Sequence, residues 1–133
     1  MTFPSLENWE NTRDTLHQAA KILGVVRVAT HDPMPNDLQY SLEIESKGLS
    51  TGKLPIGKVF LDFNEGTIEV MPKDGAISAF PLAEHTQSSL TYAVLEAFGN
   101  AGYEIEVNHE KVAGDKRFRL DIASSRDYAE TLD

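Results

Sequence analysis

Apolar and polar residues alternate in several short segments of this 133-residue chain, and this alternation restricts the possible folds more than any other feature. In residues 38–45, Leu38, Tyr40, Leu42 and Ile44 alternate with polar or charged neighbours. Because successive side chains of a strand point to opposite faces, such a segment is typical of a strand with one buried and one solvated face. Parallel sheets, buried on both faces, have strands that are apolar throughout. The alternation therefore favours an antiparallel sheet.

The same kind of reasoning predicts about six or seven strands. They lie in segments 25–29, 38–45, 59–63, 68–70, 103–107 and 117–122, with a further short strand that follows the turn at residues 73–75 and ends at residues 80–81. Asn64, Glu65 and Gly66 predict a hairpin turn between two of them. Residues 47–57 hold three glycines and Pro55, so we expect a long loop there.

Two helices are predicted. Ser5 can cap a first helix whose apolar residues follow at helical spacing until Gly24, which we expect to end it. Thr86 or Ser88 begins the second, which ends in segment 99–102. The fold class is therefore α+β, a two-layer arrangement with both helices packed on one face of a mainly antiparallel sheet. We expect one domain over residues 1–133, with residues 126–133 as a frayed turn or a tail.

Composition excludes several classes of function. The chain has 12 Lys and Arg against 21 Asp and Glu, a net charge of −9, which argues against nucleic-acid or anionic-membrane binding. It has no cysteine, so neither a disulfide nor a thiolate site can form, and a cytoplasmic location is expected. No apolar stretch approaches the ~20 residues that span a bilayer. The four histidines lie on separate predicted elements without metal-ligand spacing, so we expect no metal and no cofactor.

One segment, Trp9-Glu10-Asn11-Thr12-Arg13-Asp14-Thr15-Leu16-His17, resembles the Trp-x-x-Thr-x-x-Thr-Leu-His opening of an uncharacterised bacterial family, the domain of unknown function 5996. The similarity runs over residues 3–107, which look like the N-terminal half of family members. It includes Val26–Ala29, Gly48–Thr51, Leu54–Gly57, Asp74–Gly75, Tyr92–Leu95 and Ala101–Ile105. The chain departs from the family at residues 35–38, where Pro-Asn-Asp-Leu replaces Asn-His-Trp-Trp.

This resemblance carries no assigned reaction, ligand or fold. It implies only that five polar positions follow the family's pattern. They are Thr12, Thr15, His17, Arg27 and Thr51.

Arg13 and His17 lie one helical turn apart on the predicted first helix. A guanidinium beside an imidazole can hold an anion, and it would depress the pKa of the histidine. The alternative is that His17 is a boundary residue that hydrogen-bonds to a strand carbonyl.

Arg27 lies within the apolar segment 25–29. It either lies on the wet face of a strand opposite Glu43 or Glu45, or points toward the helices. In the second case it needs an anionic partner, because burying an unpaired charge costs several kcal/mol.

The loop of residues 47–57 carries hydroxyl groups and Lys53 between glycines, but its spacing does not match a phosphate-binding loop. Long loops in small domains are often functional. We therefore place Thr51 and Lys53 at the rim of a candidate pocket.

Two classes of function remain. The first, which we favour, is a non-enzymatic binding or assembly module, because no nucleophile, base and stabiliser can be assembled from adjacent motifs. The second is a small enzyme or anion-binding domain that uses Arg13, His17, Arg27, Thr51 and Lys53 for a small anionic ligand. We name no catalytic residue. A homodimer is predicted, because an uncovered sheet face is available and symmetric dimers are the commonest assembly.

Overall fold

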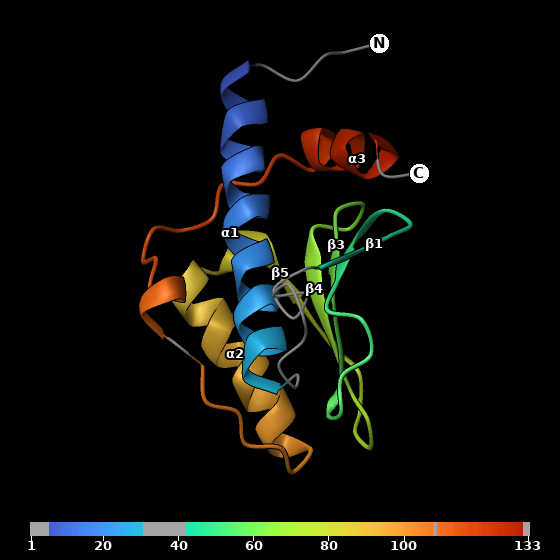
Figure 1. The fold of residues 1–133 in the computed structure, drawn as a ribbon. Helices are drawn as coiled ribbons and strands as arrows, with labels where there is room; N and C mark the ends of the chain where they lie inside the picture. The colour runs from blue at the N-terminus through green and yellow to red at the C-terminus, as the bar shows by residue number, and fades with distance from the viewer. Residues whose placement is uncertain (1–5, 31–41, 108, 132–133) are drawn as a thin grey trace.

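The computed structural model describes residues 6–30, 42–107 and 109–131 (Figure 1). Its helices and strands, in chain order, are α1 (Leu6–Thr30), β1 (Glu43–Glu45), β2 (Gly48–Ser50), β3 (Gly57–Asp62), β4 (Thr67–Pro72), β5 (Ser78–Pro81), η2 (Leu82–Glu84), α2 (Gln87–Asn100), η3 (His109–Val112) and α3 (Ile122–Thr131). The fold is α+β, as the sequence predicts.

The five strands form one sheet in the order β1-β2-β3-β4-β5, and every neighbouring pair is antiparallel. The central hairpin of β3 and β4 follows the predicted alternation, because Val59 and Leu61 are fully buried opposite Val70 and Ile68. Its turn is held by Asp62, whose carboxylate accepts hydrogen bonds from the amides of residues 64 and 65.

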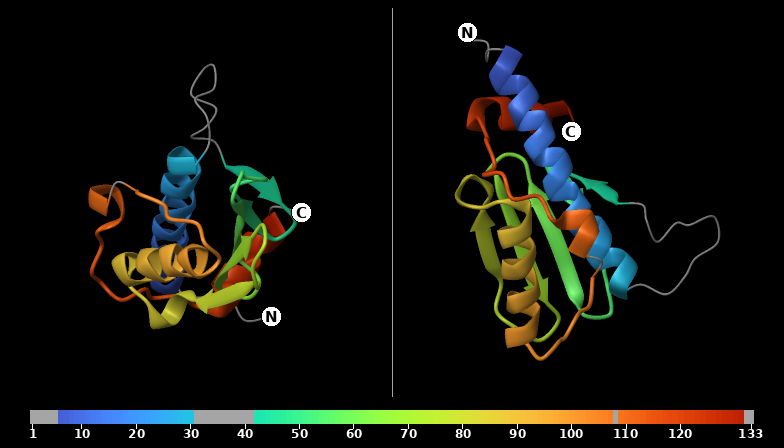
Figure 2. Two further views of the ribbon diagram at one scale, coloured as in Figure 1. Left: turned by 90° about the horizontal axis from the view of Figure 1, so that it is seen from below. Right: turned by 90° about the vertical axis from the view of Figure 1, so that its left-hand side faces the viewer.

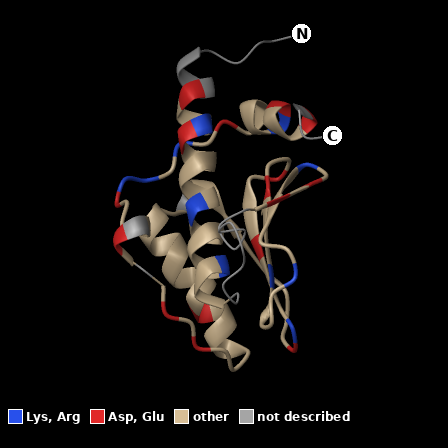
Figure 3. Cartoon of the chain, viewed as in Figure 1, with Lys and Arg blue, Asp and Glu red and all other residues tan. Residues whose placement is uncertain are grey.

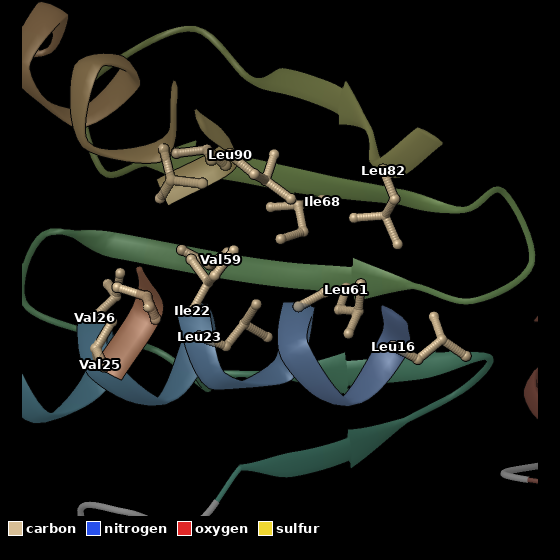
Figure 4. Packing of buried hydrophobic residues seen from close by; sticks show 14 of the residues in the cluster. Leu16, Ile22, Leu23, Val25, Val26, Val59, Leu61, Ile68, Leu82 and Leu90 are labelled. Atoms are coloured by element: carbon tan, nitrogen blue, oxygen red, sulfur yellow. The ribbon is translucent and has the colours of Figure 1, made fainter. Parts of the chain in front are cut away.

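The helices α1 and α2 contact each other and lie on the same side of the sheet in Figure 2. α1 contacts β3, and α2 contacts β4 and β5. The core lies between these layers: Ile22 and Leu23 of α1 face β3, and Leu90 of α2 lies against Ile68 of β4 (Figure 4).

The first helix is longer than the sequence predicts, since α1 continues through Gly24 to Thr30. The strand predicted at 25–29 is therefore wrong. A glycine within a helix costs about 1 kcal/mol, but Val25 and Val26 are almost fully buried when the helix continues. Burying two valine side chains contributes about 3 kcal/mol or more, so packing overrides the local preference.

The prediction of six or seven strands is also corrected to five. The segments 103–107 and 117–121 are extended but join no ladder among the described residues, apart from an isolated bridge between Thr86 and Arg117. Their alternation arises because one side of each segment packs on the helices, as Phe118 does with only 6% of its surface exposed. Residues 38–41 of another predicted strand lie outside the described residues.

The expected long loop at 47–57 instead contains β2. Residues 126–131, for which we expected a frayed helical turn or a tail, belong to α3. Asp121 caps α3, because its carboxylate accepts hydrogen bonds from the amide and the hydroxyl of Ser124. The Ser125 hydroxyl donates to the carbonyl of Phe63 at the end of β3, so α3 is attached to the sheet.

The second helix begins as predicted. Thr86 is its N-cap, and a capping box joins the side chains and amides of Thr86 and Ser89.

Candidate functional site

A groove of about 740 Å³ runs along the C-terminal half of α1. One wall is α1 itself, and the others are Leu42, just before β1, and the segment between Glu106 and Glu110. Its volume lies within the ~300–1,000 Å³ range of small-molecule sites. It is therefore the main candidate site in the described part of the chain.

The α1 wall exists because this helix does not end at Gly24. His17, Lys21, Gly24 and Val28 recur at intervals of three or four residues, so they lie on one face of the helix and all line the groove. Had residues 25–29 been a strand, Val28 would not share a face with His17.

Gly24 gives the groove an open floor. A Cβ atom placed on this residue would find no neighbouring atom within 4 Å. The rest of the floor is apolar, with Ala20, Val25, Val28 and Leu42 in the lining. An apolar group of a ligand can therefore lie directly against the helix backbone at Gly24.

Basic side chains follow one another along α1, and two of them, His17 and Lys21, line the groove. Arg13, His17 and Lys21 are spaced by four residues and are all exposed, and we call them the basic stripe. Arg13 also lies 3.5 Å from the carboxylate of Asp14, with both side chains more than half exposed. Figure 3 shows the positions of Lys and Arg on α1 among the acidic residues that dominate the chain. The stripe is thus a run of three basic side chains on a protein of net charge −9.

The facing wall is acidic. Glu106 and Glu110 are both exposed and both line the groove. The segment that carries them contacts α1 through η3. The groove therefore has walls of opposite charge above an apolar floor.

Arg27 and Thr51, two of the residues singled out in the sequence, lie together. The guanidinium of Arg27 donates a hydrogen bond to the carbonyl oxygen of Thr51, and only 8% of Arg27 is exposed. The carbonyl is available because the amide of Val59 donates to the Thr51 hydroxyl, 3.1 Å away, instead of to that carbonyl. Arg27 thus links the end of α1 to the connection between β2 and β3.

The remaining predicted site residues are dispersed. His17 precedes Arg27 by ten residues on the same helix, a rise of about 15 Å. Lys53 is exposed in the turn before β3, where the backbone of Leu54 pairs with Gly57. Neither Arg27 nor Lys53 lines the groove, whereas His17 does.

Thr12 and Thr15, the other two positions of the family pattern, hold the chain before α3. The hydroxyl of Thr12 accepts from the amide of Asp121 at 2.9 Å. The hydroxyl of Thr15 donates to the carbonyl of Arg119 and accepts from its amide, each at 3.2 Å. The hydroxyl groups of these threonines therefore bond backbone groups of Arg119 and Asp121 that a neighbouring strand would otherwise pair.

Sequence reasoning missed Lys21, Gly24, Glu106 and Glu110 as site residues. Lys21 carries a local signal, since it continues the four-residue spacing of Arg13 and His17. The acidic residues carry none, because nothing in their local sequence places them opposite α1. Among the described residues there is no group of three or more side chains arranged to hold a metal ion.

A family model described as "Family of unknown function (DUF5996)" matches residues 3–130. The match extends well beyond residue 107, where the resemblance noted in the sequence ended, and so covers nearly the whole chain. No curated protein and no solved structure matches the chain. None of the described helices is both long enough and apolar enough to cross a membrane.

Proposed function

Because the chain belongs to DUF5996, a family of unknown function, we propose its function from the geometry of the groove: a non-enzymatic binding module for a small amphipathic anion. The observation that carries this proposal is the apolar groove with His17 and Lys21 of the basic stripe in its lining. The ligand's apolar part would lie over Gly24, and its anionic group would lie near His17 and Lys21.

The apolar floor supplies the affinity in this proposal. Each CH₂ group that a ligand buries contributes about 0.8 kcal/mol. The open space at Gly24 and the small side chain of Ala20 let an alkyl or ring group approach the helix closely. A chain of several carbons is therefore needed for useful binding.

The basic stripe supplies the preference for an anion. Lys21 supplies an ammonium group, and His17 supplies an imidazole N–H that can donate a hydrogen bond. Both are exposed, so each contact with an anion contributes only about 0.2–1 kcal/mol and weakens with salt.

The alternative, a small enzyme centred on His17 and Arg27, has weaker support. The groove lining includes His17 but no hydroxyl or thiol nucleophile among the described residues. Arg27 is engaged with the carbonyl of Thr51. A binding role needs only the shape and charge of the groove.

The test is a calorimetric titration with octanoate of the wild-type protein and of Gly24→Leu. We expect octanoate to bind the wild type, and we expect the leucine to occupy the floor of the groove and reduce affinity at least tenfold. The matched control is Gly99→Leu in α2, because a Cβ there also meets no atom within 4 Å and Gly99 does not line the groove. The proposal is wrong if octanoate does not bind, or if both leucine variants bind it as the wild type does.

Two further parts of the proposal concern the cellular context. The absence of cysteine supports a location in the reducing cytoplasm. One face of the sheet is covered by none of the described helices, which supports a homodimer. Such a dimer need not block the groove, because the groove is lined mainly by α1.

A further inference from the structure

We infer that the natural ligand is a zwitterion of the amino-acid type, with an apolar side chain, a carboxylate and an ammonium group. This inference rests on the proposed function: it keeps the apolar part and the carboxylate of that ligand and adds an ammonium group. It follows from the two walls of the groove, which carry opposite charges and face the same space.

The acidic wall is built by the extended segment that follows α2. In residues 103–107, Tyr103, Ile105 and Val107 are half-buried and pack against the core, so the glutamates between them project outward. Glu106 lines the groove, whereas Glu104 does not. Packing of the alternate residues thus turns both glutamates outward, and Glu106 is the one that lies beside the groove.

The next part of the same wall is η3. Glu110 lies in its first turn and also lines the groove. η3 contacts both α1 and α2, so this carboxylate is carried by a segment packed on both helices. Glu106 and Glu110 therefore line the same groove as Lys21 and His17.

A ligand with a single charge matches only one of these walls. A carboxylate near Lys21 is also exposed to repulsion from Glu106 and Glu110, and an ammonium group alone is repelled by Lys21. A zwitterion satisfies both walls, provided that its ammonium group turns toward the glutamates. The C-terminal end of α1, at Thr30, adds a second preference for positive charge near Val28.

The apolar floor of the groove determines the third part of the ligand, its apolar side chain. It runs between the charged walls and includes Gly24, Val28 and Leu42. A polar zwitterion such as glycine would leave this surface uncovered, so the ligand needs an aliphatic or aromatic side chain.

The experiment compares three probes of equal chain length: octanoate, 2-aminooctanoate and octylamine. At low ionic strength we expect 2-aminooctanoate to bind at least fivefold more tightly than either of the others. Equal or tighter binding of octanoate would overturn the inference and leave the proposed function intact. If none of the three probes binds, both proposals fail.

A charge variant tests whether the acidic wall binds the ammonium group of 2-aminooctanoate. In Glu106→Gln we expect binding of 2-aminooctanoate to weaken threefold or more and binding of octanoate to tighten. Glu104→Gln, the matched control on the same segment, should change neither, because its side chain is exposed outside the groove. The same response in both variants would indicate a general effect of net charge and would overturn the inference. Circular dichroism and thermal unfolding establish that each variant is folded.

Discussion

At the scale of single residues, the arginine at position 27 shows how a charged side chain can serve the fold. The segment around it is apolar, and Arg27 is buried where α1 meets the connection between β2 and β3. One partner of Arg27 is the main-chain carbonyl of Thr51. This carbonyl is available because the amide of Val59 donates to the Thr51 hydroxyl and not to the Thr51 carbonyl. Both alternatives from the sequence placed Arg27 on a strand, whereas it lies on α1, buried, and donates to a carbonyl of the protein.

We predict that Arg27→Met lowers the free energy of unfolding by about 2–3 kcal/mol, because a buried carbonyl loses a charged donor while the aliphatic packing is kept. Urea denaturation monitored by circular dichroism measures the change. The control is Arg13→Met, whose exposed pair with Asp14 contributes less than about 1 kcal/mol. Equal small effects of both substitutions would contradict a structural role for Arg27.

Glu45 provides a prediction about pH. Its carboxylate accepts a hydrogen bond from Lys58 at 2.7 Å, and this contact, followed by one from Ser50, lowers the pKa of Glu45 below its ordinary value of 4.5. A group whose folded-state pKa is lowered contributes stability above its unfolded pKa. That contribution is lost as the pH falls through the folded-state pKa, in this case below about pH 4.5.

We expect an NMR titration of the Glu45 carboxyl carbon to give a pKa below 4.5, and Lys58→Met to raise it. An unchanged pKa in the Lys58 variant would show that this pair does not determine the titration of Glu45.

At the scale of elements, three parts of the surface of α1 contact three different parts of the molecule: the core, the segment 117–121 and the groove. Leu16, Ile22 and Leu23 belong to the core, Thr12 and Thr15 hold the segment 117–121, and the face that includes Lys21 forms a wall of the groove. A single helix of 25 residues can do this because its side chains project in all directions around the axis.

We predict that Thr12→Val and Thr15→Val each destabilise the protein by about 1–2 kcal/mol, since valine fills the same volume but leaves a backbone amide without its acceptor. Hydrogen exchange should accelerate at the amide of Asp121 in the first variant and of Arg119 in the second. Thr91→Val is the control, because the Thr91 hydroxyl donates only to the carbonyl of Gln87 in its own helix. Unchanged exchange at both amides would contradict the anchoring role.

At the scale of the whole molecule, the sheet has one face toward α1 and α2 and one face away from them (Figure 2). The strand register places Phe60 and Met71 on the face away from the helices, since their neighbours Val59 and Val70 point into the core. Lys58 and Glu69 lie on that same face. Its mixture of apolar and charged residues suits a moderately sized contact between two copies.

We predict that light scattering at about 100 µM gives twice the 14.7 kDa mass of one chain. Met71→Lys should shift the mass toward that of a monomer, because it places like charges on both copies at a symmetric contact. Tyr92→Lys on the exposed side of α2 should leave the mass unchanged. The prediction fails if the wild-type protein has the mass of a single chain.

The parts of the fold that follow from the sequence are those fixed by short-range interactions. The apolar residues Val59 and Leu61, followed by the turn signal at residues 64–66, predict the β3–β4 hairpin. Thr86 predicts the start of α2, because a cap needs only an amide a few residues away. These signals lie within a few residues of the structure they specify, so no knowledge of the remaining chain is required.

Other features were decided only by the tertiary structure. The valines after Gly24 favour a strand locally, but they are helical because the continued helix buries them against the sheet. The alternation in 103–107 matches a strand, yet its backbone joins no ladder among the described residues, because its apolar residues pack on the helical layer. The sequence identified His17 as a candidate but not the wall that faces it. Glu106 and Lys21 are 85 positions apart, and only long-range packing brings them to one groove.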